Sequence, residues 1–178
     1  MPENAESHSA TLVTNRTCTV EITNVSASYC LVNPQVHMDM GYSFSPPQPT
    51  VRTTKTEVCS FIKDDNTATG TAGVLTYEMF HMQSRSSKKM LAIMFSVPFD
   101  YTYYKNYLGI GFFEKQREGK DLFKYMYNNK EFPDFMRQEA NGSGVKYCPD
   151  NEKIEVRGCM CDDNKAIVKI ELYDSMRQ

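Results

Sequence analysis

Apolar and polar residues alternate one by one in two segments near opposite ends of the chain. In Cys18–Thr23 the apolar members are Cys18, Val20 and Ile22, and Ala166–Leu172 alternates in the same way. Successive side chains of a β-strand point to opposite faces, so a period of two predicts strands with one buried face. Short apolar runs bounded by turn residues give the other strand candidates, which are Glu57–Ile62, Thr71–Met79, Met90–Val97, Ile110–Glu114 and Ile154–Cys159.

Two segments between the candidate strands carry helix signals instead. Lys120–Asn129 has an acidic residue in its first turn and paired asparagines at its end, and Asp134–Ala140 follows a proline and precedes Asn-Gly. Ser45–Thr50 contains three prolines, which lack the N–H that a strand donates, so we expect a loop or a sheet edge there. Many short strands with one or two helices predict a mainly β fold, a single β-sandwich flanked by short α-helices.

Length and charge limit what else the chain can be. Its 178 residues suit one domain, expected over residues 15–178 after a flexible tail over residues 1–14. Twenty basic and 22 acidic side chains give a net charge of −2, without the basic excess of a nucleic-acid binder. The first residues lack the basic and apolar regions of a signal peptide, so a cytosolic protein and a secreted protein shown without its leader both stay open.

Cysteine and histidine show no metal or catalytic pattern. The six cysteines suit either disulfides in an oxidising compartment or small buried apolar residues in the cytosol. One residue separates Cys159 from Cys161, whereas a zinc knuckle has two between its cysteines. The three histidines are scattered, and no nucleophile or phosphate-loop motif is present. We therefore expect neither an enzyme nor a cofactor or metal site.

The aromatic residues are concentrated in one part of the chain. Eleven of the 21 aromatic residues lie between Phe95 and Tyr127, several of them in a segment over residues 98–107 that also holds Pro, Asp, Asn and Thr and therefore predicts a surface loop. Tyrosine suits the water–lipid interface, its ring attracts quaternary ammonium groups, and its hydroxyl donates to phosphate. A phosphocholine pocket is one interpretation, and the alternatives are a loop packed onto the domain or a protein–protein surface.

Several segments together resemble the actinoporin family of membrane-binding cytolysins. The most specific is Phe95–Tyr101 (FSVPFDY), and the similarity covers roughly Thr17–Leu172. It also runs through Ala68–Tyr77, Tyr103–Tyr107, Met126–Asn129 and Ala166–Leu172. The resemblance implies a sandwich with a membrane-docking aromatic loop and a pocket for phosphocholine that prefers sphingomyelin. The implied partner is a membrane lipid with a sphingomyelin or phosphatidylcholine headgroup, together with further copies of the chain on the membrane.

The resemblance also assigns site residues. The residues implied for phosphocholine binding are Ser96, Pro98, Tyr104, Phe123, Tyr127 and Ala72, of which Phe123 and Ala72 stand where the family has tyrosine and valine. The residues implied for membrane docking are Tyr101, Tyr103, Tyr107 and Leu108, with Tyr103 and Tyr107 at positions of membrane-inserting tryptophans. Asn128 stands where a further pocket tyrosine is expected, which removes one ring from the pocket.

The N-terminal segment departs most from the family, which inserts an amphipathic helix before its first strand to line a pore. Crossing about 30 Å at 1.5 Å per residue takes roughly 20 residues. Here residues 1–14 hold few apolar positions and no helical stripe. We therefore expect membrane binding with poor release of a trapped dye. The alternative is a lectin, because fungal fruit-body lectins use a related sandwich, and its partner would be a glycan.

Overall fold

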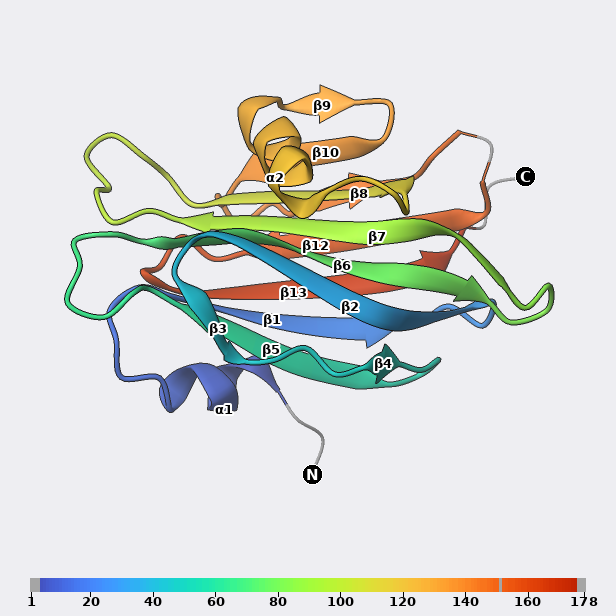
Figure 1. The fold of residues 1–178 in the computed structure, drawn as a ribbon, viewed down its shortest axis with the longest axis horizontal. Coiled ribbons are helices and arrows are strands. Elements are labelled where there is room, and N and C mark those ends of the chain that lie inside the picture. Colours follow the sequence, from blue (N-terminus) through green and yellow to red (C-terminus); the bar gives the residue numbers. More distant parts are fainter. Residues whose placement is uncertain (1–3, 151, 176–178) are drawn as a thin grey trace.

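Two β-sheets pack face to face in the computed structural model, which describes residues 4–150 and 152–175 (Figure 1). The helices are α1 (Ala5–Ala10) and α2 (Gly119–Asn128). The strands in chain order are β1 (Thr17–Asn24), β2 (Tyr29–Met40), β3 (Tyr42–Ser45), β4 (Thr50–Val51), β5 (Thr56–Ile62), β6 (Thr71–His81), β7 (Ser86–Val97), β8 (Tyr107–Glu114), β9 (Glu131–Phe132), β10 (Phe135–Glu139), β11 (Val145–Tyr147), β12 (Ile154–Met160) and β13 (Lys165–Asp174). The predicted mainly β sandwich with short helices is confirmed.

The two alternating segments of the sequence lie side by side in the first sheet. This sheet has the order β11-β12-β13-β1-β5-β3, and the second has the order β4-β2-β6-β7-β8-β10-β9. β1 and β13 pair in parallel, with Val20 opposite Val168. The seven predicted strands are all present, whereas β2 was not predicted. Asn33 and Pro34 interrupt β2 with a positive φ of 50° and a shift of register, and these hide the alternation.

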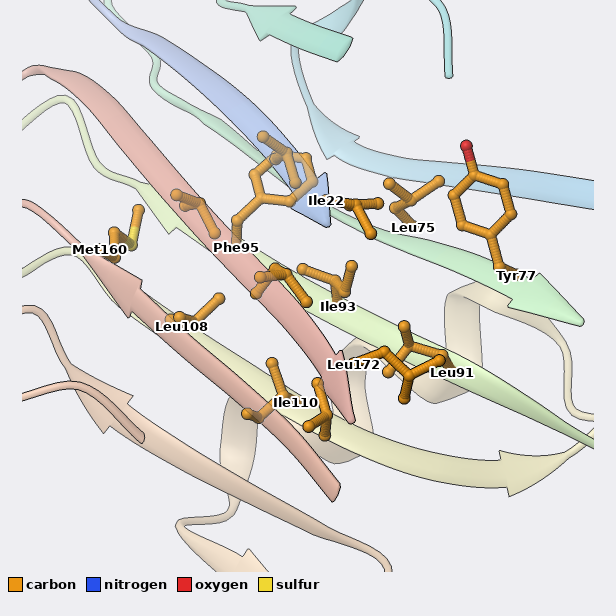
Figure 2. Packing of buried hydrophobic residues seen from close by; sticks show 14 of the residues in the cluster. Ile22, Leu75, Tyr77, Leu91, Ile93, Phe95, Leu108, Ile110, Met160 and Leu172 are labelled. Atoms are coloured by element: carbon orange, nitrogen blue, oxygen red, sulfur yellow. The ribbon is translucent and has the colours of Figure 1, made fainter. Parts of the chain in front are cut away.

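The core lies between the inner faces of the sheets (Figure 2). Phe61 and Phe95 meet there with ring centroids 4.5 Å apart. Cys18 and Cys59 are buried in the same core, and the six cysteines, all within the described ranges, are free thiols. Burial raises the pKa of Cys59 to about 12, which keeps this thiol protonated. The interpretation as small buried residues therefore holds for Cys18 and Cys59, whereas Cys30 and Cys148 are half-buried and Cys159 and Cys161 are exposed.

The second predicted helix, Asp134–Ala140, is wrong. Phe135–Glu139 form strand β10, which pairs with β8. Phe135 lies opposite Gly111, where a Cβ would come within 2.4 Å of the Cβ of Phe135. The absence of a side chain at Gly111 lets the segment approach β8 closely and complete its hydrogen bonds, so pairing with a distant strand overrides the local helix signals.

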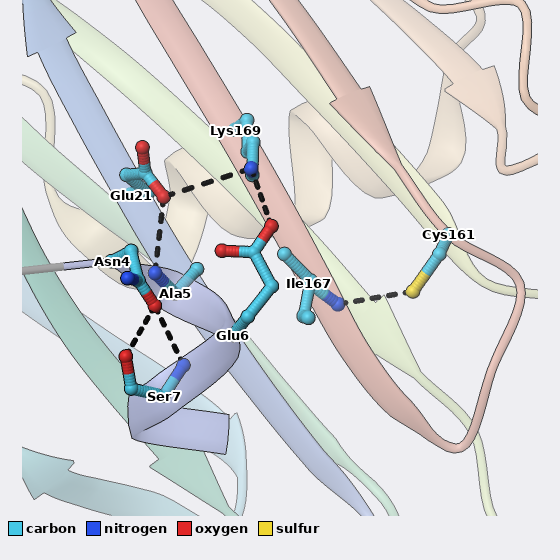
Figure 3. A network of polar contacts seen from close by, with 8 residues as sticks. All are labelled: Asn4, Ala5, Glu6, Ser7, Glu21, Cys161, Ile167 and Lys169. Carbon is cyan, nitrogen blue, oxygen red and sulfur yellow. Dashed lines mark hydrogen bonds and ion pairs between the residues drawn. The ribbon is translucent and has the colours of Figure 1, made fainter. Parts of the chain in front are cut away.

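The predicted flexible tail over residues 1–14 is also wrong where the structure describes it, and residues 1–3 lie outside the described residues. Ala5 and Leu12 are buried as α1 packs against β1, β5 and β13. The Ala5 backbone N–H donates to the Glu21 carboxylate at 3.0 Å, and Glu6 pairs with Lys169 at 2.5 Å (Figure 3). The buried positions have helical spacing, but they are small or polar and therefore leave no apolar stripe in the sequence.

The ion pair between Glu6 and Lys169 makes the attachment of α1 sensitive to pH. The hydrogen bond with Lys169 holds the pKa of Glu6 below its usual value. A carboxyl group with a lowered folded pKa stabilises the fold above its unfolded pKa, about 4.3, and this contribution is lost as the pH falls through the folded value. We expect the amides of residues 5–10 to lose protection against hydrogen exchange below that pH, while β7 stays protected.

The control for this effect is Glu6→Gln. This variant should show reduced protection of residues 5–10 already at neutral pH, and acidification should change it less than it changes the natural protein, because the Glu21 carboxylate is then the remaining acidic contact of α1. Equal protection of the two proteins at neutral pH would contradict the role of the ion pair.

Helix α2 confirms the first predicted helix and covers the outer face of the second sheet (Figure 1). Leu122, Phe123 and Met126 are buried against Ala92, Met94 and neighbouring residues of that face. The spacing of these three residues gives the helix one apolar side, and its other side is polar. This packing fixes α2 above the ends of β6 and β7, where the candidate site lies.

Candidate functional site

A cavity of about 670 Å³ opens where α2, the end of β7 and the loop after β7 meet. All six residues that the resemblance implies for phosphocholine binding line this cavity, namely Ala72, Ser96, Pro98, Tyr104, Phe123 and Tyr127. They come from four separate segments of the chain. The first and the last of them, Ala72 and Tyr127, are 55 positions apart in the sequence, and the fold brings them together. Residues that sequence reasoning missed also line it, among them Asp39, Met40, Thr69, Gly70 and Lys124.

The floor of the cavity is a row of residues across neighbouring strands. Ala72 on β6 lies opposite both Met40 on β2 and Ser96 on β7, and Ser96 in turn lies opposite Tyr107 on β8. Ser96 is only 3% exposed. Among the described residues its hydroxyl has no hydrogen-bond partner, so it is free to donate to a ligand.

One wall consists of rings from α2. Phe123 and Tyr127 lie one turn apart on the helix and stack with centroids 5.6 Å apart, and Tyr107 meets Tyr127 edge-on at 6.2 Å. Burial, and then the hydroxyls of Tyr107 and Tyr104, raise the pKa of Tyr127. Tyr127 therefore stays a neutral phenol that can donate a hydrogen bond near neutral pH.

The opposite wall is the aromatic loop, which we define as residues 98–106. A turn within it places Tyr104, because the Tyr104 N–H donates to the Asp100 carbonyl at 3.2 Å and the Asp100 carboxylate accepts from the Thr102 N–H at 2.9 Å. Tyr104 is 54% exposed at the mouth of the cavity. The predicted loop is present, and Asp100 stabilises its turn through these two hydrogen bonds.

Two residues hold the loop, Arg16 from outside it and Asn106 at its last position, and neither was among the predicted site residues. Arg16 donates from Nε to the Pro98 carbonyl at 2.9 Å and from its Nη2 to the Phe99 carbonyl at 2.7 Å. Asn106, almost fully buried, donates to the Cys161 carbonyl at 3.0 Å and accepts from the Tyr101 hydroxyl at 2.9 Å. The sequence offered one signal for Asn106, which is its position within a segment rich in tyrosine.

Charged side chains of both signs surround the cavity. Asp39 and Asp100 contribute carboxylates, and Lys124 contributes an ammonium group from the exposed side of α2. Neighbouring positive and negative groups can complement a zwitterion, whose two charges they meet separately. Asp39 and Lys124 could not be assigned from the sequence, because the length of the loop after β2 and the orientation of α2 were unknown.

The residues implied for membrane docking fall into two groups. Tyr101 and Tyr103 are exposed on the aromatic loop, Tyr103 to 79%. Tyr107 lies on β8 instead, half-buried beneath the Arg137 guanidinium at 4.3 Å. Leu108 is 2% exposed and faces the core, so its assignment to docking is wrong. Strand alternation turns Tyr107 outward and Leu108 inward, and the loop ends one residue earlier than the sequence suggested.

Two further properties concern the described residues only. No helix within residues 4–150 and 152–175 is long and apolar enough to cross a membrane. In the same part of the chain, no group of three or more His, Cys, Asp or Glu side chains is arranged to hold a metal ion.

Comparison with known proteins gives one family and several relatives. The profile of the family described as "Sea anemone cytotoxic protein" matches residues 35–174. Conoporin-Cn1 from Conus consors is 29% identical over 168 residues, which are 90% of this chain and 64% of conoporin-Cn1. Tereporin-Ca1 from Terebra anilis is 24% identical over 86% of this chain and 82% of its own length. The chain thus spans less than two thirds of conoporin-Cn1.

A solved structure shares the fold. The lipid binding protein Nakanori superposes with a TM-score of 0.67 over 96% of this chain and 78% of Nakanori. The two sequences are only 12% identical, so this similarity concerns the arrangement of the sheets and helices.

Proposed function

Because this chain belongs to the family of sea anemone cytotoxic proteins, the actinoporin-like cytolysins, we propose that it binds the phosphocholine headgroup of membrane lipids in the cavity beside α2. The observation that carries the proposal is the convergence of Ser96, Tyr104 and Tyr127 on one cavity next to an exposed aromatic loop. The ligand would be the headgroup of sphingomyelin or phosphatidylcholine, and the loop would rest in the lipid interface.

The rings at the mouth of the cavity are suited to the quaternary ammonium group. Arg137 covers Tyr107 at 4.3 Å and Arg117 covers Tyr125 at 4.1 Å, so these two rings already face a cation. Among the described residues, no Arg or Lys lies over Tyr104 or Tyr127. Each free ring contributes about 0.5–2 kcal/mol to binding a cation, depending on how far water is excluded.

Hydroxyls and charges are suited to the phosphate and to the headgroup as a whole. Ser96 donates from the floor, and the neutral phenol of Tyr127 donates from the wall. Lys124 attracts the phosphate, whereas Asp39 and Asp100 attract the ammonium group and disfavour a net negative headgroup. The site should therefore prefer zwitterionic lipids to anionic ones.

The aromatic loop supports docking at a membrane surface. Phe99, Tyr101 and Tyr103 are exposed on it, at the end of the sandwich where the cavity also opens. Phenolic rings have an apolar body and a polar tip, which suits the boundary between headgroups and acyl chains. Arg16 and Asn106 fix the two ends of the loop, so little ordering is needed on contact.

Vesicle co-sedimentation tests the proposal. We expect binding to vesicles of sphingomyelin or phosphatidylcholine to be at least about tenfold tighter than to vesicles of phosphatidylglycerol, because the cavity carboxylates meet a like charge there. Equal binding to all headgroups, or tighter binding to phosphatidylglycerol, would contradict it. Release of a dye trapped in the same vesicles measures pore formation separately, and poor release stays a prediction.

A further inference from the structure

A second cavity lies at the other end of the sandwich from the aromatic loop. Its volume is about 430 Å³, and its walls come from the start of β2, both strands of the β6–β7 hairpin and residues 152–154 at the start of β12. β7 runs from this hairpin to the aromatic loop (Figure 1). Lys89 lines this cavity and Ser96 lines the first one, and the seven residue steps between them on β7, at about 3.3 Å each, separate the two sites by roughly 23 Å. We call this second cavity the hairpin pocket.

The hairpin pocket has an apolar floor and a wall of flat rings. Met79 and Ile154, both 2% exposed, close its base between the two sheets. Tyr29 and His81 stand opposite each other on β2 and β6, with ring centroids 5.1 Å apart and planes at 64°. Such a mixture of apolar surface, rings and a few polar groups is typical of small-ligand sites of this volume.

Hydrogen bonds fix the proton of His81. The Ser84 backbone N–H donates to His81 Nδ1 at 3.2 Å, so Nδ1 carries no proton in the neutral ring. The hydrogen of the neutral ring is then on Nε2, which is a donor. The Ser84 hydroxyl, 2.9 Å from His81 Nδ1, is also 2.8 Å from the Ser86 hydroxyl. The pocket therefore presents ordered hydroxyl and imidazole groups beside its rings.

The charge of the hairpin pocket is positive. Lys88, Lys89 and Lys153 line it, and the acidic group among its described lining residues is Glu152. Lys89 forms an ion pair with Glu152. Within the described residues, Lys88 and Lys153 have no such partner, so they leave two uncompensated ammonium groups at the rim.

We propose that the hairpin pocket binds a sugar-sized anion, a pyranose ring that carries a phosphate or sulfate ester. The anion would lie between Lys88 and Lys153, and the ring would lie against Tyr29 and His81. A single oxyanion would fill little of a volume of about 430 Å³, which is why the ligand includes a ring. Because the pocket faces away from the aromatic loop, a membrane-docked molecule would keep it open to the solvent.

Chemical-shift mapping of the full-length, ¹⁵N-labelled chain tests this inference. The probes are glucose 6-phosphate, for a free phosphate ester, and N-acetylglucosamine 6-sulfate, for the sulfated end of a glycan, with neutral glucose and inorganic phosphate as references. We expect at least one ester to shift the amides of residues 81–89 and 152–154 more strongly than either reference, and the tighter ester identifies the source. Loss of the shifts at high salt is also expected.

Two variants separate this site from non-specific attraction. Lys88→Ala combined with Lys153→Ala should weaken binding of the ester about tenfold or more, because each ammonium contributes a charge-assisted hydrogen bond. Lys120→Ala, an exposed lysine on α2 outside the pocket, should leave the affinity unchanged. Three results would overturn the proposal: no shift with either ester, shifts centred elsewhere, or equal losses in both variants. None of them bears on the phosphocholine site, whose amides lie at the other end.

Discussion

Replacing both Tyr104 and Tyr127 by alanine is expected to weaken binding to sphingomyelin vesicles by about 5- to 700-fold. Each ring contributes about 0.5–2 kcal/mol of cation–π attraction, and 1.4 kcal/mol corresponds to a factor of ten in affinity. Tyr104 is largely exposed, so its loss should cost no stability. Tyr127 stacks on Phe123, and thermal unfolding of the variant must therefore be measured beside the vesicle titration.

The matched controls separate rings from hydroxyls and from general surface effects. Changing the same two residues to phenylalanine keeps both rings and removes the hydroxyls, so we expect a smaller loss than with alanine. Tyr173→Ala removes a tyrosine of β13 that does not line the cavity, and it should bind vesicles like the natural protein. If the phenylalanine and alanine pairs lose affinity equally, hydrogen bonding rather than the ring faces holds the ligand.

Phe95→Ala is expected to lower the free energy of unfolding by about 3–5 kcal/mol, because it leaves a large cavity in a packed core. Phe95 is fully buried against Phe61, in the middle of the interface between the sheets (Figure 2). For a domain of this size about 2–4 °C of melting temperature is lost per kcal/mol, so a decrease of roughly 6–20 °C should appear in thermal unfolding.

Tyr103→Ala serves as the comparison for Phe95→Ala, because it removes an exposed aromatic side chain instead of a buried one. This side chain is 79% exposed, so its removal should change stability by less than about 0.5 kcal/mol while weakening the binding to vesicles. A large loss of stability in Tyr103→Ala, or unchanged vesicle binding, would contradict the assignment of the aromatic loop to docking. A small effect of Phe95→Ala would contradict the described core.

The sequence predicted those elements whose signals are local. Alternation over Cys18–Thr23 and Ala166–Leu172 located β1 and β13, because one face of each strand is buried and the other is solvated. The helix over Lys120–Asn129 was located by its terminal residues, an acidic first turn and paired asparagines at the end. The parallel pairing of β1 with β13 joins distant segments, and no local pattern determines such a partner.

The errors arose where distant contacts decide the structure. β10 forms because Gly111 admits Phe135 beside β8, and the proline before it had suggested a helix. Helix α1 is held by groups of β1 and β13, among them Glu21 and Lys169, rather than by an apolar stripe of its own. The residue pattern within the six residues of α1 carries no information about these contacts with other strands.

The aromatic and hydroxyl-bearing residues of the candidate site could be predicted from the sequence, whereas the charged residues Asp39 and Lys124 could not. The six residues implied by the resemblance line one cavity. The motif that contains Ser96 and Pro98 lies at the end of β7, which forms part of that cavity. Asp39 joins them from the end of β2, a bulged strand that was not predicted. Leu108 was misassigned since the first residue of β8 could not be located to within one position.

Crystals of the protein grown with phosphocholine test the central claim most directly. We predict electron density for the ligand in the cavity beside α2, with the ammonium group against the rings of Tyr104 and Tyr127 and the phosphate within hydrogen-bonding distance of the Ser96 hydroxyl. A well-diffracting crystal at saturating phosphocholine that shows this cavity empty, or the ligand bound at another place on the surface, would contradict it.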